Sequence, residues 1–160
     1  MTDKPRVVFD CNVLLQAVAR EKSAAAKCLN LAESGLIQIC VSRAVLAEAE
    51  DVLNRPEIRT HFQDLSDEIV GAFLKRLQKL SVLVHPVPKK FSYPRDEDDE
   101  PYINLAVAAG ADFIISRDRD LLDLMTGHTD ECKEFRQRFR SVRVVEPTEF
   151  FNLLGESKSR

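Results

Sequence analysis

The stretch RDEDDEPYINLAVAAGADFIISRDRDLLDL, residues 95–124, contains a helix–strand unit with acidic residues at both ends. Pro101 suits the first turn of a helix, where no backbone donor is needed, and Gly110 suits the position just after the last turn. A helix is therefore predicted from Pro101 to Gly110. The apolar run that follows predicts a buried strand over 112–116. Asp118 or Asp120 is then expected to cap a short turn.

The same alternation of strands and helices continues on both sides of this stretch. Further strands are predicted over 6–10, 36–41, 81–87 and 142–145, and further helices over 23–34, 42–53, 66–80, 131–139 and from 147 onward. Residues 88–100 have no strand or helix period and are expected to form a charged loop. The alternation predicts a three-layer α/β/α sandwich around a central, mainly parallel sheet of about four or five strands.

Several local details follow from the same patterns. Asn12 is expected to cap the helix after the first strand, and Ser42 to cap the helix over 42–53. Pro56 is expected to act as a breaker after that helix. In the helix over 66–80, the spacing predicts a buried stripe made of Ile69, Phe73, Leu77 and Leu80.

Length and composition indicate one domain of ordinary size. The chain has 160 residues and a net charge of −3, and we expect a single domain over 1–155 followed by a short polar tail over 156–160. The four cysteines show no zinc-ligand spacing, so we expect reduced cysteines in a cytoplasmic protein. The first residues lack the apolar core of a signal peptide, and no apolar run approaches the roughly 20 residues of a membrane span.

Four acidic residues lie at or near places where a strand is followed by a helix. They are Asp10, Glu48, Asp99 and Asp118. The carboxyl ends of parallel strands gather at one edge of a sheet, where ligands bind. Carboxylates that converge there repel one another unless a cation or protons intervene. Because Mg²⁺ and Mn²⁺ prefer oxygen ligands, this pattern predicts a divalent metal site.

Each acid taken alone also has a purely structural interpretation. Asp10 and Asp118 can cap helices, and Glu48 can be a solvated helix residue. Glu50 borders the same apolar stripe from the other side, so helical periodicity does not choose between Glu48 and Glu50. In the run RDEDDE, Asp99 is the expected inward ligand. The expected supporting groups are Asn12, Ser42, Asp96, Ser116 and Asp120.

A polyanionic substrate needs cations near an acidic cleft. Arginines that adjoin the motifs are the candidate phosphate contacts: Arg43, Arg95, Arg117 and Arg119. A second basic strip, within 133–143, contains Arg136, Arg138, Arg140 and Arg143. Nearby acids balance that strip, so a solvated helix face is the favoured interpretation. Single-stranded RNA suits a narrow acidic cleft better than a duplex does.

The chain resembles PIN domains, and more narrowly the bacterial PIN-family toxins of toxin–antitoxin systems. The resemblance is carried by VVFDCNVLLQA, VSRAVLAEAEDVLNRP, the stretch over 95–124 and VRVVEPTEFF. It assigns Asp10, Glu48, Asp99 and Asp118 as the family's four acids. It thereby favours Glu48, six residues after Ser42, over Glu50. The chain departs from the family pattern at Cys11, where Thr or Ser is commoner, and at Glu97, where Pro is frequent.

What the resemblance implies is an endoribonuclease that needs Mg²⁺ or Mn²⁺, with the four acids as catalytic residues and metal ligands. It also implies a small antitoxin protein as partner, and a homodimer. Two alternatives remain open. A phosphatase with Asp10 as covalent nucleophile would need a second Asp at position 12 and a Lys near the fourth motif, but this chain has Asn12 and no Lys within 112–120. A catalytically silent PIN-like or receiver-like module that binds Mg²⁺ is the other alternative.

Overall fold

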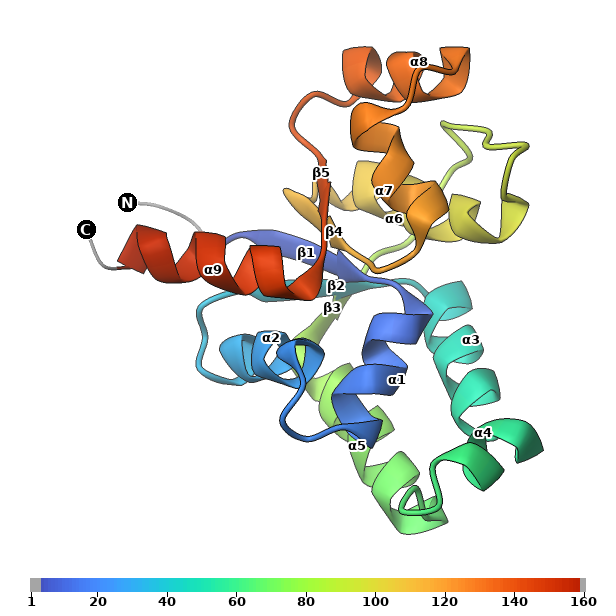
Figure 1. Cartoon of the computed structure of the whole chain (residues 1–160), viewed down its shortest axis with the longest axis vertical. Coiled ribbons are helices and arrows are strands. Elements are labelled where there is room, and N and C mark those ends of the chain that lie inside the picture. Colours follow the sequence, from blue (N-terminus) through green and yellow to red (C-terminus); the bar gives the residue numbers. More distant parts are fainter. Residues whose placement is uncertain (1–3, 159–160) are drawn as a thin grey trace.

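Five parallel strands form the centre of the fold, in the order β3-β2-β1-β4-β5 (Figure 1). The computed structural model describes the backbone of residues 4–158 and the side chains of residues 4–155. The strands are β1 (Arg6–Phe9), β2 (Gln38–Val41), β3 (Ser81–Leu83), β4 (Phe113–Ile115) and β5 (Arg143–Val145). β1 is central: its Val7 pairs with Ile39 of β2 on one side and with Phe113 of β4 on the other. Val7 and Val8 are fully buried, as expected where helices cover both faces of a parallel sheet.

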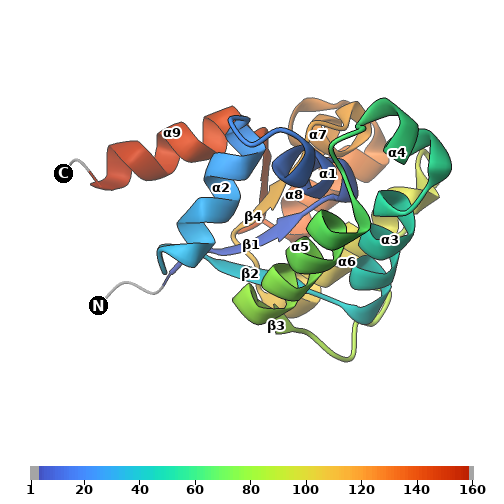
Figure 2. The ribbon, with the colours of Figure 1, turned by 90° about the horizontal axis from the view of Figure 1, so that it is seen from below.

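Helices cover both faces of the sheet and give the predicted α/β/α layers. Their bounds are α1 (Cys11–Ala19), α2 (Ala24–Glu33), α3 (Arg43–Leu53), α4 (Pro56–His61), α5 (Asp67–Leu80), α6 (Glu100–Ala109), α7 (Arg119–Thr126), α8 (Asp130–Arg138) and α9 (Pro147–Lys158), with a short 3₁₀ turn η1 (Glu97–Asp99) before α6. Figure 1 shows α6, α7 and α8 on one side of the sheet and α1, α2, α5 and α9 on the other, and Figure 2 shows the same arrangement turned by 90°. α9 continues to Lys158, and residues 159–160 of the expected tail lie outside the described residues.

Side-chain caps explain where many of the helices begin. Ser23, Ser42, Ser66 and Thr129 each accept a hydrogen bond from the backbone N–H three residues later, which satisfies one of the free donors at a helix start. The predicted cap at Ser42 is therefore confirmed. Gly110 ends α6 with φ of 63°, a left-handed conformation that favours glycine.

Several local predictions were wrong. Asp10, not Asn12, caps α1: its Oδ1 accepts from the Val13 N–H, while Asn12 is an exposed residue inside the helix. The break expected at Pro56, by contrast, is confirmed: α3 ends at Leu53, and Pro56 begins the separate helix α4, because proline is also favoured in a first turn. Asp118 precedes an eight-residue helix rather than a short turn.

One predicted strand is shorter than expected, and one predicted helix buries a different face. β3 ends at Leu83 instead of position 87. In α5 the predicted stripe is displaced, since Ile69 is 45% exposed and Val70 is buried. Among the described residues, no helix is long and apolar enough to span a membrane.

The loop before η1 is more ordered than its composition predicts. Phe91 and Tyr93 are among the largest fully buried side chains, and Phe91 packs edge-on against Phe135 of α8. Asn104 of α6 holds the loop: its Oδ1 accepts from the backbone N–H groups of Lys90 and Phe91, and its Nδ2 donates to the Phe91 carbonyl. These contacts position the acidic run that follows.

Candidate active site

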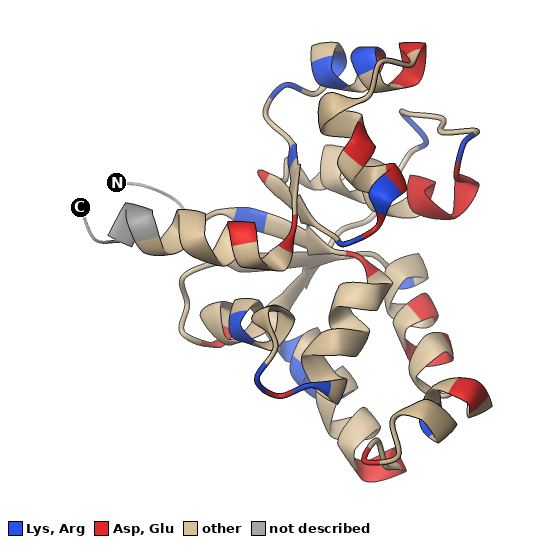
Figure 3. Ribbon diagram, in the orientation of Figure 1, with Lys and Arg blue, Asp and Glu red and all other residues tan. Residues whose placement is uncertain are grey.

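A cleft of about 620 Å³ opens at the carboxyl edge of the sheet. Its walls are formed by residues of α1, α3 and η1 and by the residues after β4. Seven carboxylates line it: Asp10, Glu48, Asp51, Asp96, Asp98, Asp99 and Asp118. All four predicted acids therefore come to one cleft, together with Asn12 and Asp96. In Figure 3 the acidic residues of η1 and α3 lie on the same side of the molecule.

Asp10 is the most constrained of these acids. It is 4% exposed and directly follows β1, and its Oδ2 accepts a hydrogen bond from the Ser116 hydroxyl. The Ser116 Oγ in turn accepts from the Asp118 N–H at 2.9 Å. Asp10 therefore has two roles: one carboxylate oxygen caps α1, and the other binds Ser116, the residue that follows β4. Ser116 thereby links the ends of β1 and β4.

Asp99 differs from the other acids at helix starts. It occupies the N-cap position of α6, but its side chain makes no capping hydrogen bond. It is 6% exposed, and its Oδ2 is buried without a hydrogen-bond partner among the described residues. An unpartnered buried carboxylate oxygen is costly and calls for a ligand such as a cation or a proton.

The tightest acidic group is centred on Asp99. One oxygen from each of Asp96, Asp99, Asp118 and Asp120 lies within 4.8 Å of the others. Oxygen ligands at this spacing suit a hard divalent cation. Asp10 and Glu48 line the same cleft but lie outside this group. Asp120 is the least available member, because its Oδ1 is held by Arg95 at 2.6 Å.

The pKa values of two acids reflect this crowding. Burial raises the pKa of Asp99 to about 8, and the charges of Asp118, Asp96 and Asp10 add to the effect. Burial also raises the pKa of Asp10 to about 6, although the hydrogen bond from Ser116 opposes the rise. Negative charge in this cleft is therefore unfavourable when no cation is bound.

Glu48 lies on the opposite wall, on α3. Its Oε1 accepts a hydrogen bond from the hydroxyl of Tyr102, at 2.7 Å, and Tyr102 is buried in α6. Glu48 lines the cleft, whereas Glu50 is exposed and lies outside it. Of the two glutamates between which helical periodicity did not choose, Glu48 is therefore the one at the acidic site. Ser42 does not line the cleft, and its hydroxyl is used to cap α3.

The arginines chosen from sequence do not line the cleft. Arg95 is bound to two carboxylates of α7, Asp120 and Asp123, at 2.6 Å each. Arg117 lines a separate, smaller hollow beside α2 and the start of α9. Arg43 and Arg119 are exposed. The cation that does line the cleft is Arg55, which follows α3.

In the predicted basic strip, Arg138, Arg140 and Arg143 are exposed, as the favoured interpretation expected, whereas Arg136 is partly buried. Arg136 donates to the carbonyls of Leu124 and Gly127, at 2.8 Å each, and so satisfies the end of α7. Arg138 pairs with Glu134 at 2.7 Å and also donates to the carbonyl of Lys90.

Sequence reasoning missed two residues that build the site. Arg55 lies past the end of α3 and has an extended backbone, so helical spacing from Glu48 gave no signal for it. Asn104 was signalled by its position as the one amide in the apolar run YINLAVAA. Such a residue inside a buried helix face usually has hydrogen-bond partners.

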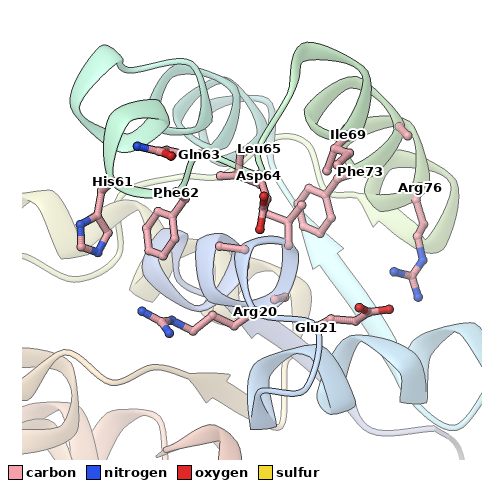
Figure 4. Close-up of a pocket in the computed structure, with 14 residues that line it drawn as sticks. Arg20, Glu21, His61, Phe62, Gln63, Asp64, Leu65, Ile69, Phe73 and Arg76 are labelled. Carbon is pink, nitrogen blue, oxygen red and sulfur yellow. The ribbon is translucent and has the colours of Figure 1, made fainter.

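A larger hollow, of about 740 Å³, lies away from the carboxylate cluster (Figure 4). We call it the α1–α5 groove. It is lined by Ala17, Val18, Ala19, Arg20, Glu21, His61, Phe62, Gln63, Asp64, Leu65, Ile69, Ala72, Phe73 and Arg76. Arg20 stacks over the ring of Phe62, 5.5 Å from its centroid. The groove has no converging carboxylates, so the chemistry belongs to the smaller cleft.

Comparison with known proteins agrees with this geometry. A family model described as PIN domain matches residues 6–120. The uncharacterized protein MJ1680 of Methanocaldococcus jannaschii is 29% identical over 147 residues, which cover 92% of this chain and 90% of that protein. The crystal structure of PAE2754 from Pyrobaculum aerophilum matches with a TM-score of 0.49 and 17% identity, covering 86% of this chain and 96% of that one. Since the family model spans more than half of the chain and includes the whole acidic cluster, this chain belongs to the PIN-domain family.

Proposed function

We propose that this protein is a metal-dependent endoribonuclease whose site is the acidic cleft. The observation that carries the proposal is the buried Oδ2 of Asp99, which has no hydrogen-bond partner among the described residues, in a carboxylate group that also contains Asp96 and Asp118. Asp10 and Asp118 each use one carboxylate oxygen to cap a helix, whereas the side chain of Asp99 makes no capping hydrogen bond. A divalent cation would satisfy this oxygen and relieve the repulsion.

In this proposal Asp99 and Asp118 hold Mg²⁺ or Mn²⁺, Asp96 supports them, and Asp10 contributes directly or through water. The bound metal would lower the pKa of a water molecule, polarise the phosphoryl oxygen and stabilise the leaving oxyanion. Glu48 completes the site from the opposite wall. Its Oε1 is fixed by Tyr102, and its other oxygen is available to orient an attacking water as a base.

The test is cleavage of a labelled single-stranded RNA by the wild type and by Asp99→Asn, with Mn²⁺, with Mg²⁺ and with chelator. Asp99→Asn keeps the shape of the side chain and removes no hydrogen bond that the structure shows. We expect it to reduce cleavage by at least about 100-fold. Glu97→Gln is the matched control, because Glu97 is an exposed residue of the same turn that does not line the cleft; it should change cleavage by no more than about twofold.

If chelator changes nothing, or if Asp99→Asn cuts as fast as the wild type, the nuclease proposal is wrong. A wild type that binds Mn²⁺ without cutting any RNA would instead support the silent metal-binding module.

We propose further that the nuclease is a toxin and that a small antitoxin protein occupies the α1–α5 groove. α1 connects the two hollows, because Asn12 at its start lines the cleft and Ala19 at its end lines the groove. The segment from Arg55 to His61 does the same on the other side. A chain bound in the groove can therefore follow these two segments toward the cleft.

Ile69→Glu tests the partner surface. Ile69 is 45% exposed in the groove, so the change should leave folding and RNA cleavage intact and abolish inhibition by the proposed antitoxin. Val82→Glu is the matched control, since Val82 is 40% exposed on β3 outside the groove. Equal inhibition of both variants would contradict the assignment of this surface.

A further inference from the structure

The cleft has a single cation among its described lining residues. Seven carboxylates face it, and Arg55 is the one basic side chain that does. A phosphodiester is itself negatively charged, so the carboxylates of the cleft repel it. Bound metal offsets part of the repulsion, but a flexible polyanion still needs a contact beside the scissile group to hold its position.

Arg55 is held loosely. Its Nε and Nη2 both donate to one oxygen, Oδ2 of Asp51, at 3.1 and 2.8 Å. The other side of the guanidinium, Nη1, has no partner among the described residues. The two side chains are 47% and 65% exposed. Exposed pairs of this kind contribute little to stability, so Arg55 can exchange its partner at small cost.

The backbone of Arg55 is fixed even though its side chain is not. Its N–H donates to the carbonyl of Val52 at 3.2 Å, and its own carbonyl accepts from the N–H groups of Ile58 and Arg59. The α3–α4 turn therefore presents the guanidinium to the cleft from a defined point.

The neighbouring arginines are not free in the same way. Arg59 donates to the carbonyls of Leu53 and Leu65 and to the side chains of Asn54 and Asp67. Arg95 is bound by two carboxylates. Arg55 alone combines a place on the cleft wall with donors that remain available.

We propose that Arg55 binds a phosphate of the single-stranded RNA substrate, exchanging Asp51 for the phosphate oxygens. The planar guanidinium matches two phosphate oxygens and keeps its charge at any working pH. Asp51 then acts as a competitor that holds Arg55 when no substrate is bound. This inference rests on the proposed nuclease function and adds the residue that engages the substrate backbone.

The proposal predicts opposite changes in KM for variants of Arg55 and of Asp51. Arg55→Gln should raise KM about tenfold with a much smaller change in kcat. Asp51→Asn should lower KM by about two- to fivefold, because it releases Arg55 and removes one negative charge. Arg138→Gln is the matched control: it breaks another exposed i,i+4 pair, with Glu134, at 46% and 52% side-chain exposure, and lies outside the cleft lining. It should leave KM unchanged.

Salt dependence identifies the contact as one to phosphate. Fluorescent single-stranded RNA is titrated in the Asp10→Asn background, with Mg²⁺, between about 50 and 200 mM salt. Adding Arg55→Gln should reduce the slope of log affinity against log salt by about 0.7, the value for one phosphate contact on a single strand. Thermal unfolding checks that every variant is folded.

Each remaining outcome overturns the inference. If Asp51→Asn and Arg55→Gln both weaken binding, the pair is structural. If the wild type cleaves RNA while Arg55→Gln has the same KM and salt slope, the phosphate contact is wrong and the nuclease proposal stands. If the wild type neither cleaves nor binds RNA, both proposals fail together.

Discussion

The acidic cleft and the α7–α8 face use charge in opposite ways. We define the α7–α8 face by Arg95, Asp120, Asp123, Arg136 and Arg138. On that face each arginine has carboxylate or carbonyl partners at 2.6–2.9 Å. In the cleft, seven carboxylates share one arginine, and the Oδ2 of Asp99 has no partner among the described residues.

The difference separates charges that support the fold from charges that await a ligand. Balanced pairs and capped carbonyls need nothing further. Crowded, buried carboxylates raise one another's pKa and destabilise the free protein, which is a recurrent property of functional sites. Asp120 belongs to both regions, because it lies in the acidic cluster and is bound by Arg95.

The largest expected effect is in the cleft and concerns Glu48. Glu48→Gln should reduce RNA cleavage by at least about 100-fold, because it removes the carboxylate proposed to act as a base. Glu50→Gln is the control on the same helix, with an expected change of no more than about twofold. Single-turnover cleavage rates measure both. Similar losses in the two variants would remove the distinction between the inner and outer sides of α3.

The α7–α8 face should respond in stability instead of activity. Arg136→Ala leaves the carbonyls of Leu124 and Gly127 without their charged donor, and should lower the free energy of unfolding by about 2–3 kcal/mol. Arg138→Gln should cost less than about 1 kcal/mol, because its pair with Glu134 is exposed. Urea unfolding measures both. An Arg136→Ala protein that is fully stable but cannot cleave RNA would contradict the claim that this face supports the fold and not the activity.

A smaller effect is expected at Tyr102, which links the core to the cleft. Tyr102→Phe keeps the buried ring and removes the donor to Glu48. We expect kcat to fall by about three- to tenfold while KM is retained, because Glu48 is less firmly oriented. A steady-state comparison of kcat and KM tests this. An unchanged kcat would show that the hydroxyl serves only packing.

Much of the fold was predictable because local signals coincide with it. Serine caps, Pro101, Gly110 and short apolar runs place the helices and strands near their observed bounds. The failures have tertiary causes. Phe91 and Tyr93 are buried because α8 and Asn104 provide surfaces for them, and no local pattern contains that information.

The meeting of the four acids was predictable from the sequence, but several other residues of the cleft were not. Strand ends that meet at one sheet edge bring Asp10, Glu48, Asp99 and Asp118 to one cleft. The partner of each oxygen depends on side-chain rotamers, so the free oxygen of Asp99 could not be foreseen. Side-chain rotamers also decide that Arg95, which is close to the acids in sequence, binds Asp120 of α7, while Arg55 lines the cleft.

The most direct test of the account is thermal unfolding of the wild type and Asp99→Asn, in chelator and in Mn²⁺, across pH. The ordinary pKa of Asp is 3.8, and that of Asp99 is raised to about 8. Between these values the folded state binds more protons than the unfolded state, so wild-type stability in chelator should fall as pH rises from about 4 to 8. Asp99→Asn should remove most of this fall. At the upper end of this range it should be more stable than the wild type by at least about 1 kcal/mol, or roughly 2–4 °C. Mn²⁺ should stabilise the wild type at that pH and leave Asp99→Asn nearly unchanged. A wild type that ignores Mn²⁺, or an Asp99→Asn protein that is less stable in chelator, would contradict the claim that this cleft is built around a cation.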